Sequence, residues 1–464
     1  TSEGDQMELI EIFTDYMPVF MFASLALLLF SGYPVAFLLG GLSIAYGLIG
    51  YSFGMFSLIE FFNFVPRVWG GAAENLVLVA LPTFVFMGVM MERSGIANDM
   101  LYCCQVLLRR VPGSLALAVT VMGTILAAMT GIIGASVTMM TALALPTMLR
   151  QNYSHALATG CIAASGTLGI LIPPSIMLII MADLLSVSVG TLFMAALAPG
   201  LFLASVYLVY IATISTIKPE VAPSLPPELL YVPPNEMPAL LLRSFVPPVF
   251  LIAFIKSSIL LGFATPSEAG AVGAFGALLL GWIKGRVKWE IMKGVCHSAG
   301  MTIAMIFFII MCATAFAYVF RSLGGDDVVE GLILEAELDS WGLLFLIMGI
   351  VFVLGFFLDW IEITLIILPV FAPMVVELDF GDHVAHEEMI FWFTILVAIN
   401  LQTSFLTPPF GYALFYLKSI APAEVKTLSI YKGIIPFVAI QASVLSLVVY
   451  QPEIALWLPR QVYD

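Results

Sequence analysis

Four clusters of small and hydroxyl-bearing residues interrupt apolar segments of the sequence, at residues 130–138, 165–175, 355–364 and 400–411. Glycine, proline, serine and threonine in such places break a helix and expose its backbone, which is tolerated only around a cavity or inside protein. The N-termini of half-helices then direct partial positive charge at an anion, whereas freed carbonyl and hydroxyl oxygens can bind a cation such as sodium. The clusters therefore predict a site that holds a small anion together with a cation.

The clusters form two pairs, one in each half of the chain, which indicates an internal repeat. Each copy has a proline near a predicted helix end, Pro146 or Pro369, and later a Pro-Pro pair that begins at Pro173 or Pro408. The connector between these marks is basic in the first copy, at residues 150–155, and acidic in the second. Equivalent connectors of opposite charge belong on opposite sides of a membrane, so the repeat is predicted to be inverted.

Aligning the two copies places Ser136 opposite Asp359, Ser165 opposite Asn400, and Thr167 opposite Gln402. Small residues could instead serve only close helix packing, but their pseudo-symmetric pairing favours a site. Asp359 is the sharpest single candidate, because an acid in a long apolar run usually belongs to an ion or substrate pathway. Its alternative role is a hydrogen bond to the end of a broken helix. We expect the anion to contact Ser136, Ser165, Thr167, Asp359, Asn400, Gln402 and Thr403.

The composition requires a membrane to surround these clusters. Of the 464 residues, 61% are hydrophobic and 10% are charged, whereas a soluble domain carries about 25% charged residues. Runs such as residues 249–261 and 301–313 lack the alternation of a barrel strand, so the spans are predicted to be helices. We expect an all-α integral membrane protein of about a dozen transmembrane helices.

The distribution of charge predicts the orientation of the chain. The net charge of −14 argues against nucleic acid as a partner. Basic residues crowd residues 284–293 and 109–110, which the positive-inside rule places in the cytoplasm. Acidic residues gather at residues 326–339 and 377–388, which are predicted to face outward.

Several motifs, in order along the chain, resemble one transporter family. They are Leu81-Pro-Thr-Phe-Val-Phe-Met-Gly88 with Ser94-Gly95-Ile96, Thr130-Gly-Ile-Ile-Gly-Ala-Ser136, Gly169-Ile-Leu-Ile-Pro-Pro-Ser175, Gly262-Phe-Ala-Thr-Pro-Ser-Glu-Ala-Gly-Ala-Val-Gly273 and Phe357-Leu-Asp-Trp360. The chain is similar in these segments to the large membrane subunit (M subunit, DctM-like) of tripartite ATP-independent periplasmic (TRAP) transporters.

The resemblance implies an elevator-type transporter in which two re-entrant helical hairpins and their partner broken helices carry substrate and sodium past a static scaffold. By position, residues 131–146 would form the first hairpin tip and residues 355–369 the second. It also implies two protein partners, a small four-helix membrane subunit (Q type) and a periplasmic substrate-binding protein (P type). Na⁺ would be the coupling ion, and by position its oxygen ligands would come from Ser136, Thr138, Gly169, Pro173, Thr364, Thr403, Thr407 and Pro408.

The resemblance further divides the chain into functional segments. The expected segments are an N-terminal tail (1–16), scaffold (17–112), transport domain with the first hairpin (113–215), Pro-rich connector (216–239), scaffold (240–340) and transport domain with the second hairpin (341–464). Residues 240–261 are expected to be scaffold helix that makes a subunit contact or faces lipid.

The expected function is sodium-coupled import of a small organic anion, a carboxylate or a sulfonate, across the bacterial inner membrane, without enzymatic activity. No ATP-binding motif of the Gly-x-x-x-x-Gly-Lys-Ser/Thr kind occurs in the sequence, so an ion gradient is expected to supply the energy. A stand-alone sodium-coupled symporter of similar architecture would need no binding protein. A proton-translocating respiratory subunit would need a line of intramembrane ionisable residues, and Asp359 is nearly alone.

Overall fold

The computed structural model describes residues 12–130, 133–223, 232–233, 235–335, 337–408 and 411–463, and these residues form helices without any strand. The α-helices, in chain order, are α2 (Met17–Leu29), α3 (Val35–Ser52), α4 (Phe64–Val68), α5 (Ala80–Arg93), α6 (Ile96–Leu108), α7 (Ser114–Thr130), α8 (Ile133–Arg150), α9 (His155–Thr167), α10 (Ile176–Leu184), α11 (Val189–Ile217), α12 (Met237–Leu240), α13 (Val246–Leu260), α14 (Pro266–Ile283), α15 (Trp289–Ser322), α16 (Gly325–Glu335), α17 (Ser340–Leu354), α18 (Trp360–Val376), α19 (Met389–Leu406), α20 (Tyr412–Ile420), α21 (Thr427–Tyr450) and α22 (Glu453–Tyr463). Shorter 3₁₀ or π segments are η1 (Leu58–Asn63), η2 (Trp69–Ala73), η3 (Leu168–Ile170), η4 (Leu241–Phe245), η5 (Gly381–His383) and η6 (His386–Glu388).

Eight of the described helical segments are long and apolar enough to cross a membrane. They are Val35–Ser52, Ile133–Arg150, Val189–Ile217, Met237–Leu260, Pro266–Ile283, Trp289–Ser322, His386–Leu406 and Thr427–Tyr450. Other apolar helices have only 10–17 residues, as interrupted helices would. The all-α, multi-pass class expected from composition is confirmed, whereas the count of about a dozen spans stays a prediction.

The chain divides into two compact units. Unit 1 contains the described residues of Thr1–Leu76, Ala304–Ile350 and Asp359–His386, and unit 2 contains those of Val77–Ile303, Val351–Leu358 and Glu387–Asp464. The predicted scaffold and transport segments stay a prediction, because a moving domain is defined by displacement between states rather than by packing within one state.

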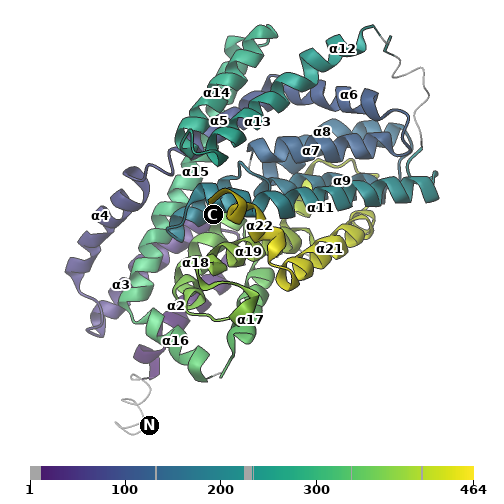
Figure 1. Ribbon diagram of the computed structural model, residues 1–464. Coiled ribbons are helices and arrows are strands. Elements are labelled where there is room, and N and C mark those ends of the chain that lie inside the picture. Colours follow the sequence, from purple (N-terminus) through teal and green to yellow (C-terminus); the bar gives the residue numbers. More distant parts are fainter. Residues whose placement is uncertain are drawn as a thin grey trace. The chain divides into compact units, whose positions relative to one another are not determined.

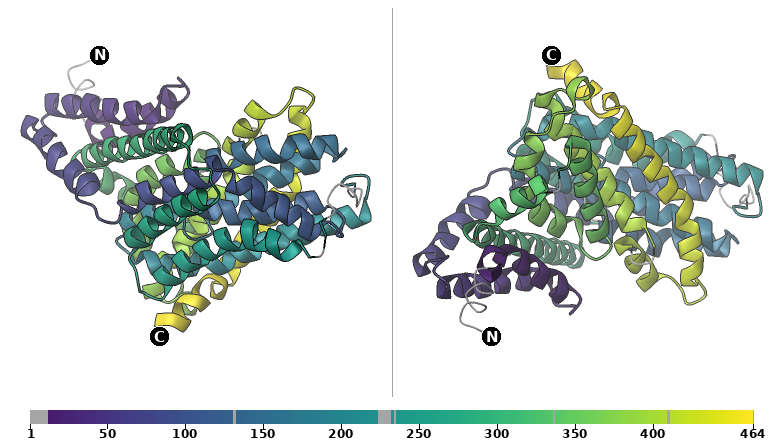
Figure 2. Two further views of the ribbon diagram at one scale, coloured as in Figure 1. Left: turned by 90° about the horizontal axis from the view of Figure 1, so that it is seen from above. Right: turned by 90° about the horizontal axis from the view of Figure 1, so that it is seen from below.

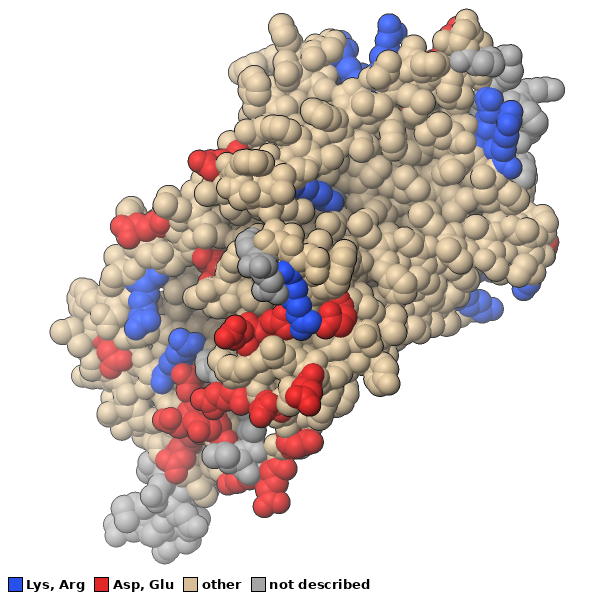
Figure 3. Space-filling view, in the orientation of Figure 1, with Lys and Arg blue, Asp and Glu red and all other residues tan. Residues whose placement is uncertain are grey.

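Unit 1 is held together by aromatic contacts and carries an acidic surface. The ring of Phe22 on α2 packs edge-on against Phe316 and Phe320 on α15, at centroid distances of 5.5 and 4.9 Å. The backbone N–H of Asp379 donates to Ser340 Oγ at 3.3 Å, which joins the two acidic segments. Figure 3 shows Asp and Glu gathered over the part of unit 1 that contains α16. The exposed acids of these segments are Asp326, Asp327, Glu330, Glu335, Glu337, Asp339, Glu377, Asp379 and Asp382.

Unit 2 brings α7, α8, α9 and α11 side by side (Figure 1). Helix α21, yellow in Figure 2, lies along α9, and two glycines let their backbones touch. A Cβ atom added to Gly160 would lie 2.3 Å from the carbonyl oxygen of Gly433. Small residues at helix crossings allow this close approach, and the van der Waals packing that results helps to associate helices in lipid.

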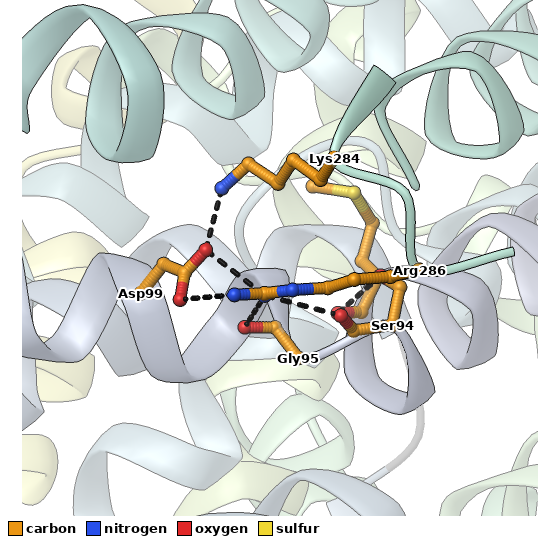
Figure 4. A network of polar contacts seen from close by, with 6 residues as sticks. Ser94, Gly95, Asp99, Lys284 and Arg286 are labelled. Carbon is orange, nitrogen blue, oxygen red and sulfur yellow. Dashed lines mark hydrogen bonds and ion pairs between the residues drawn. The ribbon is translucent and has the colours of Figure 1, made fainter. Parts of the chain in front are cut away.

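A charged network fastens the α5–α6 turn to the connector after α14 (Figure 4). Lys284 Nζ lies 2.6 Å from Asp99 Oδ2, and Arg286 Nη2 donates to Asp99 Oδ1 at 3.0 Å. Arg286 Nη1 also donates to the carbonyl oxygens of Ser94 and Gly95, at 3.2 and 2.9 Å. Gly95 has a φ of +71°, a conformation that favours glycine. The basic connector and the Ser94-Gly95 motif are therefore parts of one structural clamp.

Two predicted helix ends are wrong, one by about one turn and the other by about two turns. Helix α8 continues past Pro146 to Arg150, and α18 continues past Pro369 to Val376. Proline removes one backbone donor, and in membrane helices neighbouring groups satisfy what is freed. Arg321 Nη2 donates to the carbonyl oxygen of Pro369 at 2.8 Å, although the carbonyl that this proline frees is that of Leu365, four residues earlier.

Candidate functional site

The first polar cluster lies where α7 meets α8. Gly131 and Ile132, at the predicted tip of the hairpin, lie outside the described residues. Helix α8 starts at Ile133, and α7 and α8 pack against each other. Ser136, in the first turn of α8, is 1% exposed. Thr138 is partly exposed, and its Oγ1 donates to the carbonyl oxygen of Gly134 at 2.7 Å.

The second cluster is a broken helix, as predicted. Helix α9 ends at Thr167, and the short η3 follows before α10 begins at Ile176. Gly169 and Pro173 lie buried within this break. Ser175 closes it, because its Oγ donates to the carbonyl oxygen of Ile170 at 2.7 Å and caps the N-terminus of α10.

The second copy has a matching break in unit 2. Helix α19 ends at Leu406, Thr407 is extended, and α20 begins at Tyr412. Pro408 is described and partly exposed, whereas Pro409 and Phe410 lie outside the described residues. Both predicted interruptions of this kind are therefore present in the fold.

Glycines set the spacing among these segments. A Cβ atom added to Gly166 would lie 2.6 Å from Val137 Cγ2, so the end of α9 packs directly on the start of α8. A Cβ on Gly123 would lie 2.7 Å from Ser165 Cβ, and one on Gly355 would lie 1.9 Å from Ser404 Oγ. Ser404, which is fully buried, was not selected from the sequence. Its position directly after Thr403 in the same polar cluster was the available signal.

The two broken helices meet at a hydrogen bond between aligned residues. Gln402 Nε2 donates to Thr167 Oγ1 at 3.3 Å, and both residues have no exposed surface. Gln402 Oε1 is buried without a hydrogen-bond partner among the described residues. A buried amide oxygen without a partner is costly, and a ligand or water can satisfy it. Beside this pair, Ser165, Asn400 and Thr403 are at most 3% exposed.

The hydroxyl groups of the cluster present oxygen lone pairs rather than protons. Thr167 Oγ1 donates to Ala164 O at 2.9 Å, Thr403 Oγ1 to Ile399 O at 2.8 Å, and Thr407 Oγ1 to Thr403 O at 2.8 Å. Ser165 Oγ likewise donates to Cys161 O. A hydroxyl has one proton to donate and two lone pairs. A hydroxyl whose proton is already donated offers only its lone pairs, which can bind a cation. The side-chain amides of Asn400 and Gln402 are therefore the better hydrogen-bond donors to an anion.

Asp359 and Thr364 belong to unit 1. The backbone N–H of Trp360 donates to Asp359 Oδ1 at 2.7 Å, and that of Asp359 donates to Glu362 Oε2 at 3.0 Å. Asp359 thus caps the N-terminus of α18, which is the alternative role considered for it. Thr364 Oγ1 and the indole nitrogen of Trp360 are buried with no hydrogen-bond partner among the residues described.

Comparisons with known proteins identify the class of membrane transporter. The YdaH transporter of Alcanivorax borkumensis has a similar fold, with a TM-score of 0.57 and 13% sequence identity over 87% of this chain and 89% of that one. Residues 22–454 match the family described as "Tripartite ATP-independent periplasmic transporter, DctM component". The chain belongs to this family, and it is therefore a multi-pass protein of the bacterial inner membrane rather than an enzyme.

Relatives cover nearly the whole chain. The C4-dicarboxylate TRAP transporter large permease protein DctM of Pseudomonas aeruginosa is 28% identical over 84% of this chain and 87% of its own length. The sialic acid TRAP transporter large permease protein SiaM of Vibrio cholerae is 28% identical over 93% of this chain and 96% of its own length. The isethionate TRAP transporter permease protein DctMQ of Oleidesulfovibrio alaskensis is 27% identical over 96% of this chain and 66% of its own length.

Proposed function

We propose that this chain imports a small organic anion, a carboxylate or a sulfonate, that a periplasmic binding protein delivers. The names of relatives support this class, because C4-dicarboxylates, sialic acid and isethionate are all small organic anions. The observation that carries the proposal is the buried junction of two broken helices, where Gln402 Nε2 donates to Thr167. Gln402 Oε1, an acceptor without a partner among the described residues, would accept from a hydroxyl of the substrate or bind a cation that accompanies the anion.

Sodium coupling is the second part of the proposal. Bound Na⁺ would offset the charge of the anion within the membrane, where an uncompensated charge is costly. Thr403 and Thr407 support this role, because their protons are bonded within α19 and their lone pairs remain for a cation. In the first copy, Ser136, Thr138, Gly169 and Pro173 would supply the equivalent oxygens. Transport by an elevator movement, as the family resemblance implies, completes the proposal.

The small membrane subunit is the third part. The relative named DctMQ is longer than this chain, which matches 66% of its length. The unmatched third of DctMQ is long enough to contain a second component, such as a small membrane subunit fused to the large one. We therefore propose that this chain works with a separate small membrane subunit.

The test is uptake into proteoliposomes that contain this chain and the small subunit. Labelled dicarboxylates, sugar acids and sulfonates are supplied with a candidate binding protein, and an inward sodium gradient is imposed. We expect uptake only when both the binding protein and sodium are present. Uptake without a binding protein would identify a stand-alone symporter, and full uptake in sodium-free medium with an intact proton gradient would refute sodium coupling.

A matched pair of variants connects uptake to the site. We expect Ser136→Ala to abolish sodium-dependent uptake, because it removes a buried hydroxyl at the start of α8. Ser205→Ala is the control, since Ser205 is exposed on α11 and its hydroxyl donates to its own helix, at Leu201 O, at 2.7 Å. Equal loss in both variants would contradict a specific role for Ser136.

A further inference from the structure

Two buried polar groups at the start of α18 lack a hydrogen-bond partner. Trp360 has no exposed surface and Thr364 is 1% exposed. Neither the indole nitrogen Nε1 of Trp360 nor Oγ1 of Thr364 has a partner among the described residues. Within the described part of unit 1, they are the only buried side-chain nitrogen or oxygen atoms without one. Because such a group is costly to bury unpaired, the two atoms together point to a bound molecule.

The two groups lie on one face of the helix. Trp360 and Thr364 are four residues apart, and residues at this spacing stand one above the other, about 6 Å apart along the helix axis. Trp360 is the first residue of α18, directly after the cap formed by Asp359. Both groups therefore belong to the N-terminal part of the helix, where the helix dipole favours negative charge.

The hydroxyl of Thr364 differs from the other threonine hydroxyls of the polar clusters, which donate to carbonyl oxygens of their own helices. The offset that aligns Pro146 with Pro369 also aligns Thr141 with Thr364. Thr141 is likewise 1% exposed, but its Oγ1 donates to the carbonyl oxygen of Val137 at 2.6 Å. Thr364 makes no such bond, so its proton remains available to a ligand.

The indole of Trp360 differs in the same way from a second fully buried indole. Trp392 on α19 also has no exposed surface, and its Nε1 donates to the carbonyl oxygen of Val448 at 3.0 Å. An indole N–H can only donate, and a buried one usually finds an acceptor. The protein supplies that acceptor to Trp392, whereas no described residue supplies one to Trp360.

The acids next to these donors are bonded to the backbone at the helix end. Asp359 Oδ1 accepts from the backbone N–H of Trp360, and Glu362 Oε2 accepts from that of Asp359. Glu362 is two residues from Trp360 and two from Thr364, a spacing that does not place side chains on the same face. The face of α18 that carries Trp360 and Thr364 therefore presents two donors and no carboxylate from within the helix.

We propose that Trp360 Nε1 and Thr364 Oγ1 donate hydrogen bonds to oxygen atoms of the transported anion, a carboxylate or a sulfonate. The inference rests on the proposed function, because it takes that anion as the ligand. Two unpaired donors match a group that carries only acceptors, and hydrogen bonds to a charged oxygen are stronger than those to a neutral one. Thr364 thereby acts through its proton, rather than through the lone pairs that a sodium ligand would use. A buried water that accepts from both groups is the competing explanation.

The first experiment separates a contact with the anion from a contact with sodium. The chain is purified with its small subunit, and its thermal stabilisation is titrated with whichever of succinate, gluconate and isethionate the unsubstituted chain takes up. A second titration varies sodium, and each titration is made at a saturating level of the other component. We expect Thr364→Val to raise the anion concentration for half the effect at least about tenfold, because it removes one hydrogen bond to a charged group. The sodium titration should not change.

Two further threonine variants complete this experiment. Thr364→Ser keeps the hydroxyl and should retain anion binding. Thr394→Val is the matched control, because Thr394 has no exposed surface and its proton is already donated to the carbonyl oxygen of Ile390 at 2.6 Å. It should change neither titration.

The second experiment tests the indole. Trp360→Phe and Trp392→Phe each remove a buried indole N–H and leave a cavity, so both should lower the melting temperature of the ligand-free protein. We expect only Trp360→Phe to weaken anion binding as well, again at least about tenfold. An equal loss of anion binding in both variants would show that the effect comes from packing rather than from the donor.

The outcomes separate this inference from the proposed function. Unchanged anion binding in Thr364→Val or in Trp360→Phe would overturn the inference in favour of a buried water, while uptake by the unsubstituted chain would leave the proposed function intact. A change in the sodium titration alone would identify Thr364 as a sodium ligand and would also overturn it. Failure of the unsubstituted chain to take up or bind any of the three anions would instead refute the proposed function, and this inference with it.

Discussion

Gln402 Nε2 and Thr167 Oγ1 lie 3.3 Å apart, although the residues are separated by 235 positions in the chain. The internal repeat aligns these same two residues with each other. If the predicted repeat is related by a two-fold axis, that axis passes close to this contact. The hydrogen bond marks the place where the two broken helices α9 and α19 converge, and Gln402 Oε1, which has no partner within the described part of the chain, is found there.

Gln402 can be tested by removing its side chain. We expect Gln402→Ala to fold, because one neutral hydrogen bond contributes only about 0.5–1.5 kcal/mol. Uptake should nevertheless fall at least tenfold, since the variant loses the donor and acceptor at the junction (about 1.4 kcal/mol). Thr167→Val tests the partner, and the double variant should lose less than the sum of the two. Unchanged uptake in Gln402→Ala would remove this residue from the site.

Asp359 offers a test that separates a structural role from a charged one. Asn caps a helix about as well as Asp, whereas Ala costs about 1 kcal/mol at such a position. Asp359→Asn should therefore retain the thermal stability of the protein, and Asp359→Ala should lower it. If the carboxylate also serves the ion or substrate, Asp359→Asn will lose uptake despite its stability. Full uptake in Asp359→Asn would show that Asp359 is only a cap.

Gly166 tests whether the close packing of α8 on α9 matters. A methyl group there would lie 2.6 Å from Val137 Cγ2 and 3.3 Å from the Val137 backbone, so a neighbour must shift. We expect Gly166→Ala to cost about 1–3 kcal/mol and to reduce uptake, measured by thermal unfolding in detergent and by transport. Gly300→Ala is the matched control, because nothing lies within 4 Å of its added Cβ atom. Identical behaviour of both variants would show that the contact tolerates displacement.

Asp99 should matter for stability rather than for transport chemistry. Its carboxylate accepts from both Lys284 and Arg286, and Asp99→Ala would leave the two cations facing each other. Because hydrogen bonds between charged groups contribute about 1.5–3 kcal/mol, we expect a loss of about 2 kcal/mol. Thermal unfolding of the purified protein measures it, and high salt should reduce the difference from the unsubstituted chain. A melting temperature equal to that of the unsubstituted chain would argue against the clamp.

The sequence alone determined the membrane class, the two interrupted helices and the polar residues within them. Apolar content compels a helical membrane protein, because lipid cannot bond to a free backbone. Two polar clusters could be located because proline and glycine break helices for local steric reasons. One contains Ser165 and Thr167, and the other contains Asn400 and Gln402. The C-terminal ends of α8 and α18, which lie beyond Pro146 and Pro369, could not be located from the sequence. Groups from neighbouring segments decide whether a helix continues past a proline.

Only the tertiary structure decided which of these residues meet. The contact between Thr167 and Gln402 depends on how α9 and α19 cross. Gly160 and Gly166 in turn bring α9 directly against α21 and α8. The cap formed by Asp359 depends on where α18 starts. Local sequence fixes where a helix is interrupted, whereas the direction in which each freed polar group points is fixed by the packing of helices far apart in the chain.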